Sequence, residues 1–323
     1  WDTATGGMLQ KLAGHESDVV SAEFSLDGAR IVTASLDNTV RVWSAVTGEE
    51  LLKIEGDTDG INFMKSAKFS PDGTNILTFG SFDNSVHVWE ASTGDEISQL
   101  KGHSLSVNYA SYSIDGHYII TTSSDKTARL WDAASGDPIL KLEGHERSLN
   151  SAAFSRDGSR IVTGSDDGTV RVWDVTFPRD VMRIGTHDTS AFSATFSQDG
   201  ESVVTASADT TARVWDSTTA QLRMKLQGHR DVVRSAAFSQ DGSLIVTASM
   251  DKTARVWDAM TGAAISSLEG HAGGVYDAAF SPDGRRIVTA SGDGAVWVWD
   301  TANFKEVMKL SDNDAAVFAV AFS

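Results

Sequence analysis

The chain has 323 residues, of which 41% are hydrophobic and 22% charged, with a net charge of −17 and no cysteine. This balance is typical of a globular protein, and the lack of cysteine excludes disulfides, thiolate metal sites and a cysteine nucleophile. No apolar run approaches the roughly 18 residues that cross a bilayer. The acidity argues against a nucleic-acid partner, because phosphate backbones are bound by clustered Lys and Arg. A reducing, cytoplasmic location fits this composition.

Tryptophan marks an internal repeat along the chain. Eight of the nine Trp residues are 42 residues apart, except for one spacing of 46, and only Trp297 falls outside this pattern. A fixed period of about 40–45 residues indicates a repeat architecture. The repeating positions are Trp1, Trp43, Trp89, Trp131, Trp173, Trp215, Trp257 and Trp299.

The predicted elements are short strands, in the same order in every repeat. One apolar strand is predicted over 8–12, seven complete repeats of four strands follow, and a last strand is predicted over 317–322. The strands expected in the repeat around Trp257 cover 232–239, 244–249, 253–258 and 264–268. Apolar, β-branched runs bounded by Asp, Gly and Ser are typical of strands, and no segment has a sustained helical period. The fold class is therefore predicted to be all-β.

Two dipeptides recur with this period. Gly-His stands at 14–15, 102–103, 144–145, 228–229 and 270–271, and Trp-Asp ends the third strand of most repeats. In these motifs the chain resembles the WD-repeat family along essentially its whole length, and its regularity resembles the long WD-repeat arrays of bacteria. The resemblance implies a seven-bladed β-propeller of four-stranded antiparallel blades, with surplus strands at the termini. The blades would be centred on Trp43, Trp89, Trp131, Trp173, Trp215, Trp257 and Trp299.

The surplus strands leave two ways to close a ring. The strand over 8–12 completes the blade around Trp299 and leaves 306–323 over, or that blade keeps its own fourth strand and leaves 1–12 and 317–323 over. In both cases a lone first strand would be an unprotected edge. We expect residues 1–323 to be one propeller of a longer chain that continues into an adjacent propeller.

Six histidines share one slot of the repeat. Each is followed by an Asp after 22 residues and by a Trp six residues later. In WD-repeat proteins these groups join a Ser or Thr of the second strand in a hydrogen-bonded chain, so the resemblance implies structural fasteners and not hydrolase triads. Buried polar groups need such partners. The predicted fasteners are His15, Asp37, Trp43, His103, Asp125, Trp131, His145, Asp167, Trp173, His187, Asp209, Trp215, His229, Asp251, Trp257, His271, Asp293 and Trp299.

Partner binding is expected where the repeat varies. In WD-repeat rings the top face carries the loops between blades and the loops between the second and third strands. Two positions map there: one lies four residues before the aromatic residue of the first strand, and the other directly precedes the fastening Asp. They differ from blade to blade and include residue types enriched at interfaces, although neutral drift of exposed loops remains the alternative. The predicted partner-binding residues are Leu36, Lys65, Phe82, Asn108, Asn150, Asp166, Phe192, Arg234, Met250 and Tyr276.

Two further repeats break the pattern. The second carries an insert over 57–63, with Asp57 in the histidine slot, and an extra residue near 77–81. These features fit an apolar binding edge and a decayed repeat equally well. The fourth has Phe177, Pro178, Arg179 and Asp180 between its third and fourth strands, which predicts a stiffened turn on the opposite face.

The function predicted from these observations is binding without catalysis. No catalytic residue, metal or cofactor is expected, because no unique, asymmetric set of acid, base or metal ligands remains once the repeated residues are removed. We expect a protein-interaction scaffold or sensor module of a larger multidomain signalling protein, which binds a protein or peptide mainly on its top face. The sensor role is an analogy with the bacterial arrays. The alternatives are a self-assembling structural scaffold and a propeller hydrolase with a central-channel site.

Overall fold

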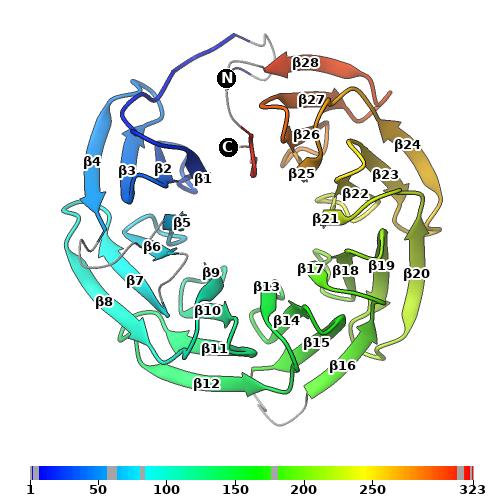
Figure 1. The fold of residues 1–323 in the computed structure, drawn as a ribbon, viewed down its shortest axis with the longest axis horizontal. Helices are drawn as coiled ribbons and strands as arrows, with labels where there is room; N and C mark the ends of the chain where they lie inside the picture. Colours follow the sequence, from blue (N-terminus) through cyan, green and yellow to red (C-terminus); the bar gives the residue numbers. More distant parts are fainter. Residues whose placement is uncertain are drawn as a thin grey trace. The chain divides into compact units, whose positions relative to one another are not determined.

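The computed structural model describes residues 2, 7–56, 64–80, 84–175, 181–310, 316–320 and 322. Within these ranges the chain forms 28 strands and no helix. The strands make seven four-stranded antiparallel sheets, the blades of a β-propeller, so the predicted fold class is confirmed (Figure 1). The chain divides into two compact units, Trp1–Gly144 and His145–Phe322, and each is described by itself.

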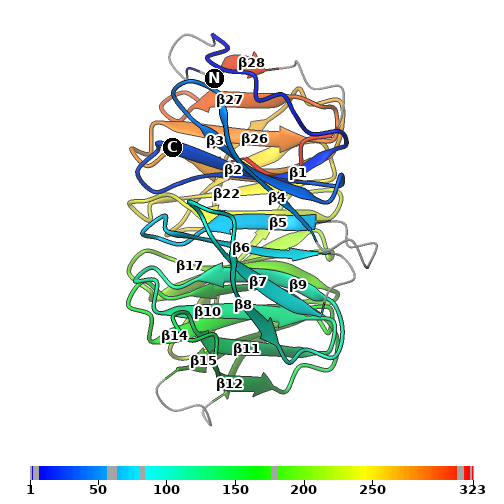
Figure 2. The same cartoon turned by 90° about the vertical axis from the view of Figure 1, so that its left-hand side faces the viewer.

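The first unit holds blades 1 to 3, and each blade has its strands in chain order across the sheet. Blade 1 comprises β1 (Val19–Phe24), β2 (Arg30–Ser35), β3 (Thr39–Ser44) and β4 (Glu50–Glu55). Blade 2 comprises β5 (Met64–Phe69), β6 (Asn75–Gly80), β7 (Ser85–Glu90) and β8 (Glu96–Lys101). Blade 3 comprises β9 (Val107–Tyr112), β10 (Tyr118–Ser123), β11 (Thr127–Asp132) and β12 (Pro138–Glu143). Figure 2 shows these blades one after another, and β6 lies against β9.

The second unit holds blades 4 to 7 in the same arrangement. Blade 4 comprises β13 (Leu149–Phe154), β14 (Arg160–Ser165), β15 (Thr169–Asp174) and β16 (Val181–Thr186). Blade 5 comprises β17 (Ala191–Phe196), β18 (Ser202–Ser207), β19 (Thr211–Asp216) and β20 (Leu222–Gln227). Blade 6 comprises β21 (Val233–Phe238), β22 (Leu244–Ser249), β23 (Ala254–Asp258) and β24 (Ala264–Leu268). Blade 7 comprises β25 (Val275–Phe280), β26 (Arg286–Ser291), β27 (Val296–Asp300) and β28 (Glu306–Leu310).

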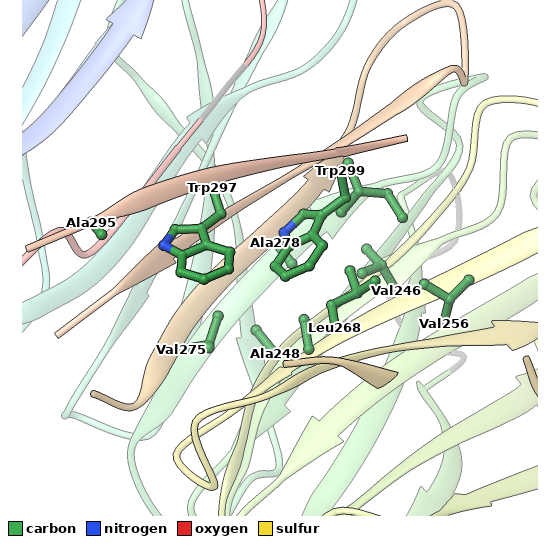
Figure 3. Packing of buried hydrophobic residues seen from close by; sticks show 11 residues of the cluster. Val246, Ala248, Val256, Leu268, Val275, Ala278, Ala295, Trp297 and Trp299 are labelled. Atoms are coloured by element: carbon green, nitrogen blue, oxygen red, sulfur yellow. The ribbon is translucent and has the colours of Figure 1, made fainter. Parts of the chain in front are cut away.

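The core lies between neighbouring blades. In one cluster, Val246, Val256 and Leu268 of blade 6 are buried together with Ala278 and Trp299 of blade 7 (Figure 3). Burial of such side chains stabilises a fold by roughly 1.5–3 kcal/mol each. A blade therefore owes much of its stability to the blade beside it, as in other repeat architectures.

The chain ends carry short segments without a sheet of their own. Blade 7 contains its own fourth strand, because β28 pairs with β27. Val320 N donates to Asp277 Oδ2 at 3.3 Å, just as Ala278 N donates to Ser235 Oγ at 3.3 Å one blade earlier. Among the described residues, 7–12 and 316–320 form no strand of their own, although Val317 N donates to Ser291 O of β26 at 3.0 Å. Membership of the terminal segments in an adjacent propeller stays a prediction.

Candidate partner-binding surface

The two variable positions of a blade lie at the same end of its sheet. Backbone hydrogen bonds join the loop after the second strand to the residue before the first strand, as in Leu36 N to Asp18 O and Met250 N to Val232 O, both 2.9 Å. Bonds of this kind bring the two variable positions to one end of the sheet in the six blades whose loop after the second strand is described. The fastening histidines and aspartates lie at this end too.

A chain of hydrogen bonds links the fastening residues in six of the blades. In blade 3, Trp131 Nε1 donates to Thr121 Oγ1 at 2.9 Å, and the two nitrogens of His103 lie 2.8 Å from Thr121 Oγ1 and from Asp125 Oδ2. Across the six sets the His–Asp distances are 2.8–3.2 Å, the His–Thr distances 2.7–2.8 Å and the Trp–Thr distances 2.8–3.0 Å. All members of each chain satisfy one another.

Burial sets the protonation state of these groups. It lowers the pKa of His103, against the opposing effect of Asp125, and the pKa of His145, His229 and His271 in the same way. A neutral imidazole with Nδ1–H donates to the carboxylate and accepts the threonine O–H at Nε2. Burial raises the pKa of Asp167, but hydrogen bonds from Thr169 and from the amide of Glu146 outweigh it and hold that pKa at about 2.

The free energy of unfolding is expected to fall as the solution is acidified below about pH 6.5. The pKa of these four histidines is lower in the folded chain than the usual 6.5. The unfolded chain therefore binds more protons, and stability is lost as the pH falls below 6.5. Asp167 adds a second loss between about pH 4 and pH 2. Denaturant unfolding at pH 7.5 and 5.5 measures the first effect, and equal stabilities would contradict it.

The second repeat keeps part of this arrangement. Trp89 Nε1 donates to Thr78 Oγ1 at 2.8 Å. Its insert over 57–63, the loop 81–83 with Phe82, and the turn 177–180 of the fourth repeat lie outside the described residues.

The glycine before the fastening histidine makes room for side chains of the third strand. A Cβ atom at Gly102 would lie 2.7 Å from Arg129 Nη1 and 3.2 Å from the Trp131 ring. In five blades an arginine stands two residues before the Trp. Its contacts vary: Arg41 pairs with Glu50, whereas Arg129 lies 6.0 Å from the Trp131 ring centroid. Trp297 occupies this slot in blade 7. Its ring centroid lies 5.2 Å from that of Trp299, and Figure 3 shows the two rings.

Several predicted partner-binding residues form pairs in the second unit. The Arg234 guanidinium of blade 6 lies 4.6 Å from the Phe192 ring centroid of blade 5. In blade 4, Asn150 Nδ2 donates to Asp166 Oδ1 at 2.8 Å and to Ala191 O of blade 5 at 3.1 Å. Each of these pairs leaves part of its surface exposed, and Arg234 is the most exposed member.

The remaining predicted residues that the structure describes lie partly in the second unit and partly in the first. In the second unit, the ring centroids of Tyr276 and Phe318 lie 4.9 Å apart. The Met250 side chain packs closely against Gly274, where an added Cβ would lie 2.8 Å from Met250 Cε. In the first unit, Asn108 Nδ2 donates to Ser124 Oγ at 3.1 Å. Leu36 and Lys65 are half-buried, and burial lowers the pKa of Lys65.

A polar cluster on the first strands of blades 1 to 3 escaped prediction. Lys68 Nζ donates to Tyr109 Oη at 3.3 Å and lies 4.4 Å from that ring centroid, while Glu23 Oε2 accepts the Phe69 amide at 3.2 Å. Burial raises the pKa of Glu23. The cluster borders a pocket of about 270 Å³. The sequence did contain a signal for this cluster, because blades 1 and 2 have charged residues, Glu23 and Lys68, at a position where later blades have small uncharged ones. The residues at this position in blades 4 to 7 are Ala153, Thr195, Ala237 and Ala279.

The described ranges contain neither a candidate membrane-spanning helix nor a candidate metal cluster. No helix there has the length and apolar character needed to span a membrane. No group of three or more His, Asp or Glu side chains in the same ranges is arranged to hold a metal ion.

Comparison with known proteins identifies the repeat. The model of the "WD domain, G-beta repeat" family matches seven stretches: 6–44, 48–90, 94–132, 136–174, 179–216, 220–258 and 262–300. The crystal structure of the computationally designed Ika8 protein is similar over 98% of this chain and 93% of that chain, with a TM-score of 0.85 and 27% sequence identity.

Curated relatives match over shorter stretches. Eighty residues, 24% of this chain, are 38% identical to 8% of the U3 small nucleolar RNA-associated protein 21 of Saccharomyces cerevisiae. A match over 76 residues, also 24% of this chain, is 33% identical to 25% of the serine-threonine kinase receptor-associated protein of Dictyostelium discoideum. A further match, again 24% of the chain, is 34% identical to 22% of eukaryotic translation initiation factor 3 subunit I of Neosartorya fischeri. The chain thus matches a quarter or less of the length of these relatives.

Proposed function

Because the chain belongs to the WD-domain, G-beta repeat family, we propose that it is a non-catalytic protein-interaction scaffold or sensor module. It binds a protein or peptide partner at the top-face positions. The observation that carries this proposal is the pair of Phe192 and Arg234, whose aromatic ring and guanidinium meet across two blades. Aromatic residues and Arg contribute most to binding at protein interfaces, and this pair has no counterpart in the other described blades.

The relatives support the same role. Their names describe a receptor-associated protein and a subunit of a translation factor, which are components of protein assemblies. A cytoplasmic place in a larger signalling protein fits the absence of cysteine and remains part of the proposal. The fastening sets then serve to hold six of the blades in shape.

The test is affinity capture with a top-face variant. Phe192→Ala, Arg234→Ala and Tyr276→Ala are combined in one immobilised chain and exposed to an extract of the source organism. We expect the partner captured by the native chain to fall by about thirtyfold or more, the loss that corresponds to a residue worth about 2 kcal/mol at an interface. Quantitative mass spectrometry measures the loss.

A matched control removes similar apolar surface elsewhere. Val46→Ala, Leu51→Ala and Leu222→Ala truncate exposed side chains away from the top-face positions, so this variant should keep the partner. Circular dichroism verifies that both variants are folded. Equal capture by both folded variants would contradict the assignment of the top face.

A further inference from the structure

The first residue of the second strand contacts an aromatic residue of the next blade. In the first unit, the Arg30 guanidinium lies 5.0 Å from the Phe69 ring centroid, and Arg30 Nη2 donates to Gly73 O at 2.6 Å. In the second unit, Arg160 lies 5.4 Å from the Phe196 ring, and its Nη2 donates to Gly200 O at 2.8 Å. In both of these grooves between neighbouring blades, an arginine guanidinium is therefore bound by an aromatic ring and by the carbonyl oxygen of a turn glycine.

The groove between blades 5 and 6 lacks an arginine at the first residue of the second strand. Ser202 stands 42 residues after Arg160, and a pocket of about 870 Å³ lies here, bordered by Ser202, Phe238 and Gly242. Between blades 6 and 7 the equivalent residue is Leu244, which packs against the core cluster, as Phe280 does. A small polar residue thus stands where arginine or leucine stands in these other grooves, and its hydroxyl accepts a hydrogen bond from Arg223 Nη1 of β20 at 2.6 Å.

The carbonyl acceptor of this groove is free. Gly200 O receives hydrogen bonds from Arg160 and from Ser217 Oγ, and Gly284 O receives one from Thr301 Oγ1. At the equivalent positions around Gly242, Ser202 replaces the arginine and Ala259 replaces the hydroxyl residue. As a result, none of the described side chains donates to Gly242 O.

The charge of the groove favours a cation. Asp199, Asp241 and Asp258 border it. Its one cation, Arg223, pairs with Asp216 at 2.6 Å and donates to Ser202 Oγ at 2.6 Å, so both of its terminal nitrogens are engaged. In two blades the aspartate that follows the blade tryptophan pairs with an arginine: Asp216 pairs with Arg223 in blade 5, and Asp300 pairs with Arg286 in blade 7. Asp258 is the equivalent residue of blade 6, and no described arginine pairs with it.

We propose that the groove between blades 5 and 6 binds an arginine side chain of a partner protein. The guanidinium stacks on Phe238, donates to Gly242 O and pairs with Asp258. Met260, 88% exposed at the rim, supplies an adaptable apolar contact for the neighbouring residues of the partner. The net charge of −17 attracts such a basic segment. This site lies at the Asp-Gly turns, at the opposite end of the blades from the top-face positions, and does not depend on them.

The test compares three blocked peptides, Ala-Ala-Xaa-Ala-Ala, in which Xaa is arginine, lysine or citrulline. Citrulline keeps the shape of arginine without its charge, and lysine keeps the charge without the planar group. We expect the arginine peptide to bind at least about tenfold more tightly than either, a difference of ~1.4 kcal/mol. Titration calorimetry measures the affinities, and chemical-shift changes around Phe238 and Gly242 locate the site.

Two variants and a control make the test specific. Ser202→Arg places a guanidinium where Arg160 has one in blade 4 and removes the hydroxyl that accepts from Arg223, so it should lower the affinity for the arginine peptide at least about tenfold. Met260→Lys places a positive charge at the rim and should weaken binding severalfold. Ile139→Arg adds the same charge on an exposed strand of the first unit and should bind like the native chain. Equal binding of arginine and citrulline peptides, or unchanged binding by Ser202→Arg, would overturn the proposal.

Discussion

Thr121→Val is expected to lower the free energy of unfolding by about 3 kcal/mol. Thr121 is fully buried, and its hydroxyl lies between Trp131 Nε1 at 2.9 Å and His103 Nε2 at 2.8 Å. Valine has nearly the same shape, so no cavity forms, but both nitrogens lose their partner in a site that water does not reach. Each buried polar group without a partner costs about 1–3 kcal/mol. Denaturant unfolding followed by circular dichroism measures the change.

Thr78→Val in the neighbouring blade is the matched comparison. Thr78 is equally buried, but the described part of its repeat supplies a single partner, Trp89 Nε1 at 2.8 Å. Its replacement should cost about half as much as that of Thr121, because one nitrogen is orphaned and not two. If the two variants lost the same stability, the histidine bond would contribute nothing to the fastening of blade 3.

The regular part of this molecule was accessible from the sequence because it repeats. The strands expected over 244–249 and 264–268 coincide with β22 and β24, since short β-branched runs between Asp and Gly turns have few other structures open to them. The hydrogen bonds of the fastening residues follow from a fixed spacing that brings His, Asp and Trp of one blade together. Local spacing within one repeat is enough to place such contacts.

Contacts between repeats were harder to predict. Arg234 meets Phe192, and Arg160 meets Phe196, through the packing of one blade on the next. Such pairs join positions about 40 residues apart, and the spacing within a single repeat does not indicate that they meet. The groove at Ser202 was hard to predict for the same reason, because a smaller residue at this position borders a pocket only when the next blade packs against it. Comparison of facing positions between consecutive repeats would have indicated it.

Gly185→Ala is expected to lower the free energy of unfolding by about 3 kcal/mol. Gly185 lies on β16, two residues before His187, where the Gly-His pattern of the other repeats is shifted by one residue. An added Cβ would lie 2.1 Å and 2.2 Å from two atoms of the Trp215 indole. That indole is itself buried and bonded to Thr205. Neither the strand nor the ring can move without breaking hydrogen bonds, so overpacking is not relieved.

The control for this variant is Gly158→Ala in the same unit. Gly158 has a φ of +69° and nothing within 4 Å of an added Cβ, so its replacement costs only the backbone strain of about 1–2 kcal/mol. Urea unfolding of both variants separates steric overpacking from backbone strain. A smaller loss for Gly185→Ala than for Gly158→Ala would mean that the strand shifts to accept the methyl group. A larger loss would show that the absence of a side chain at Gly185 lets Trp215 reach Thr205. Gly185 would then have this role although it does not directly precede His187.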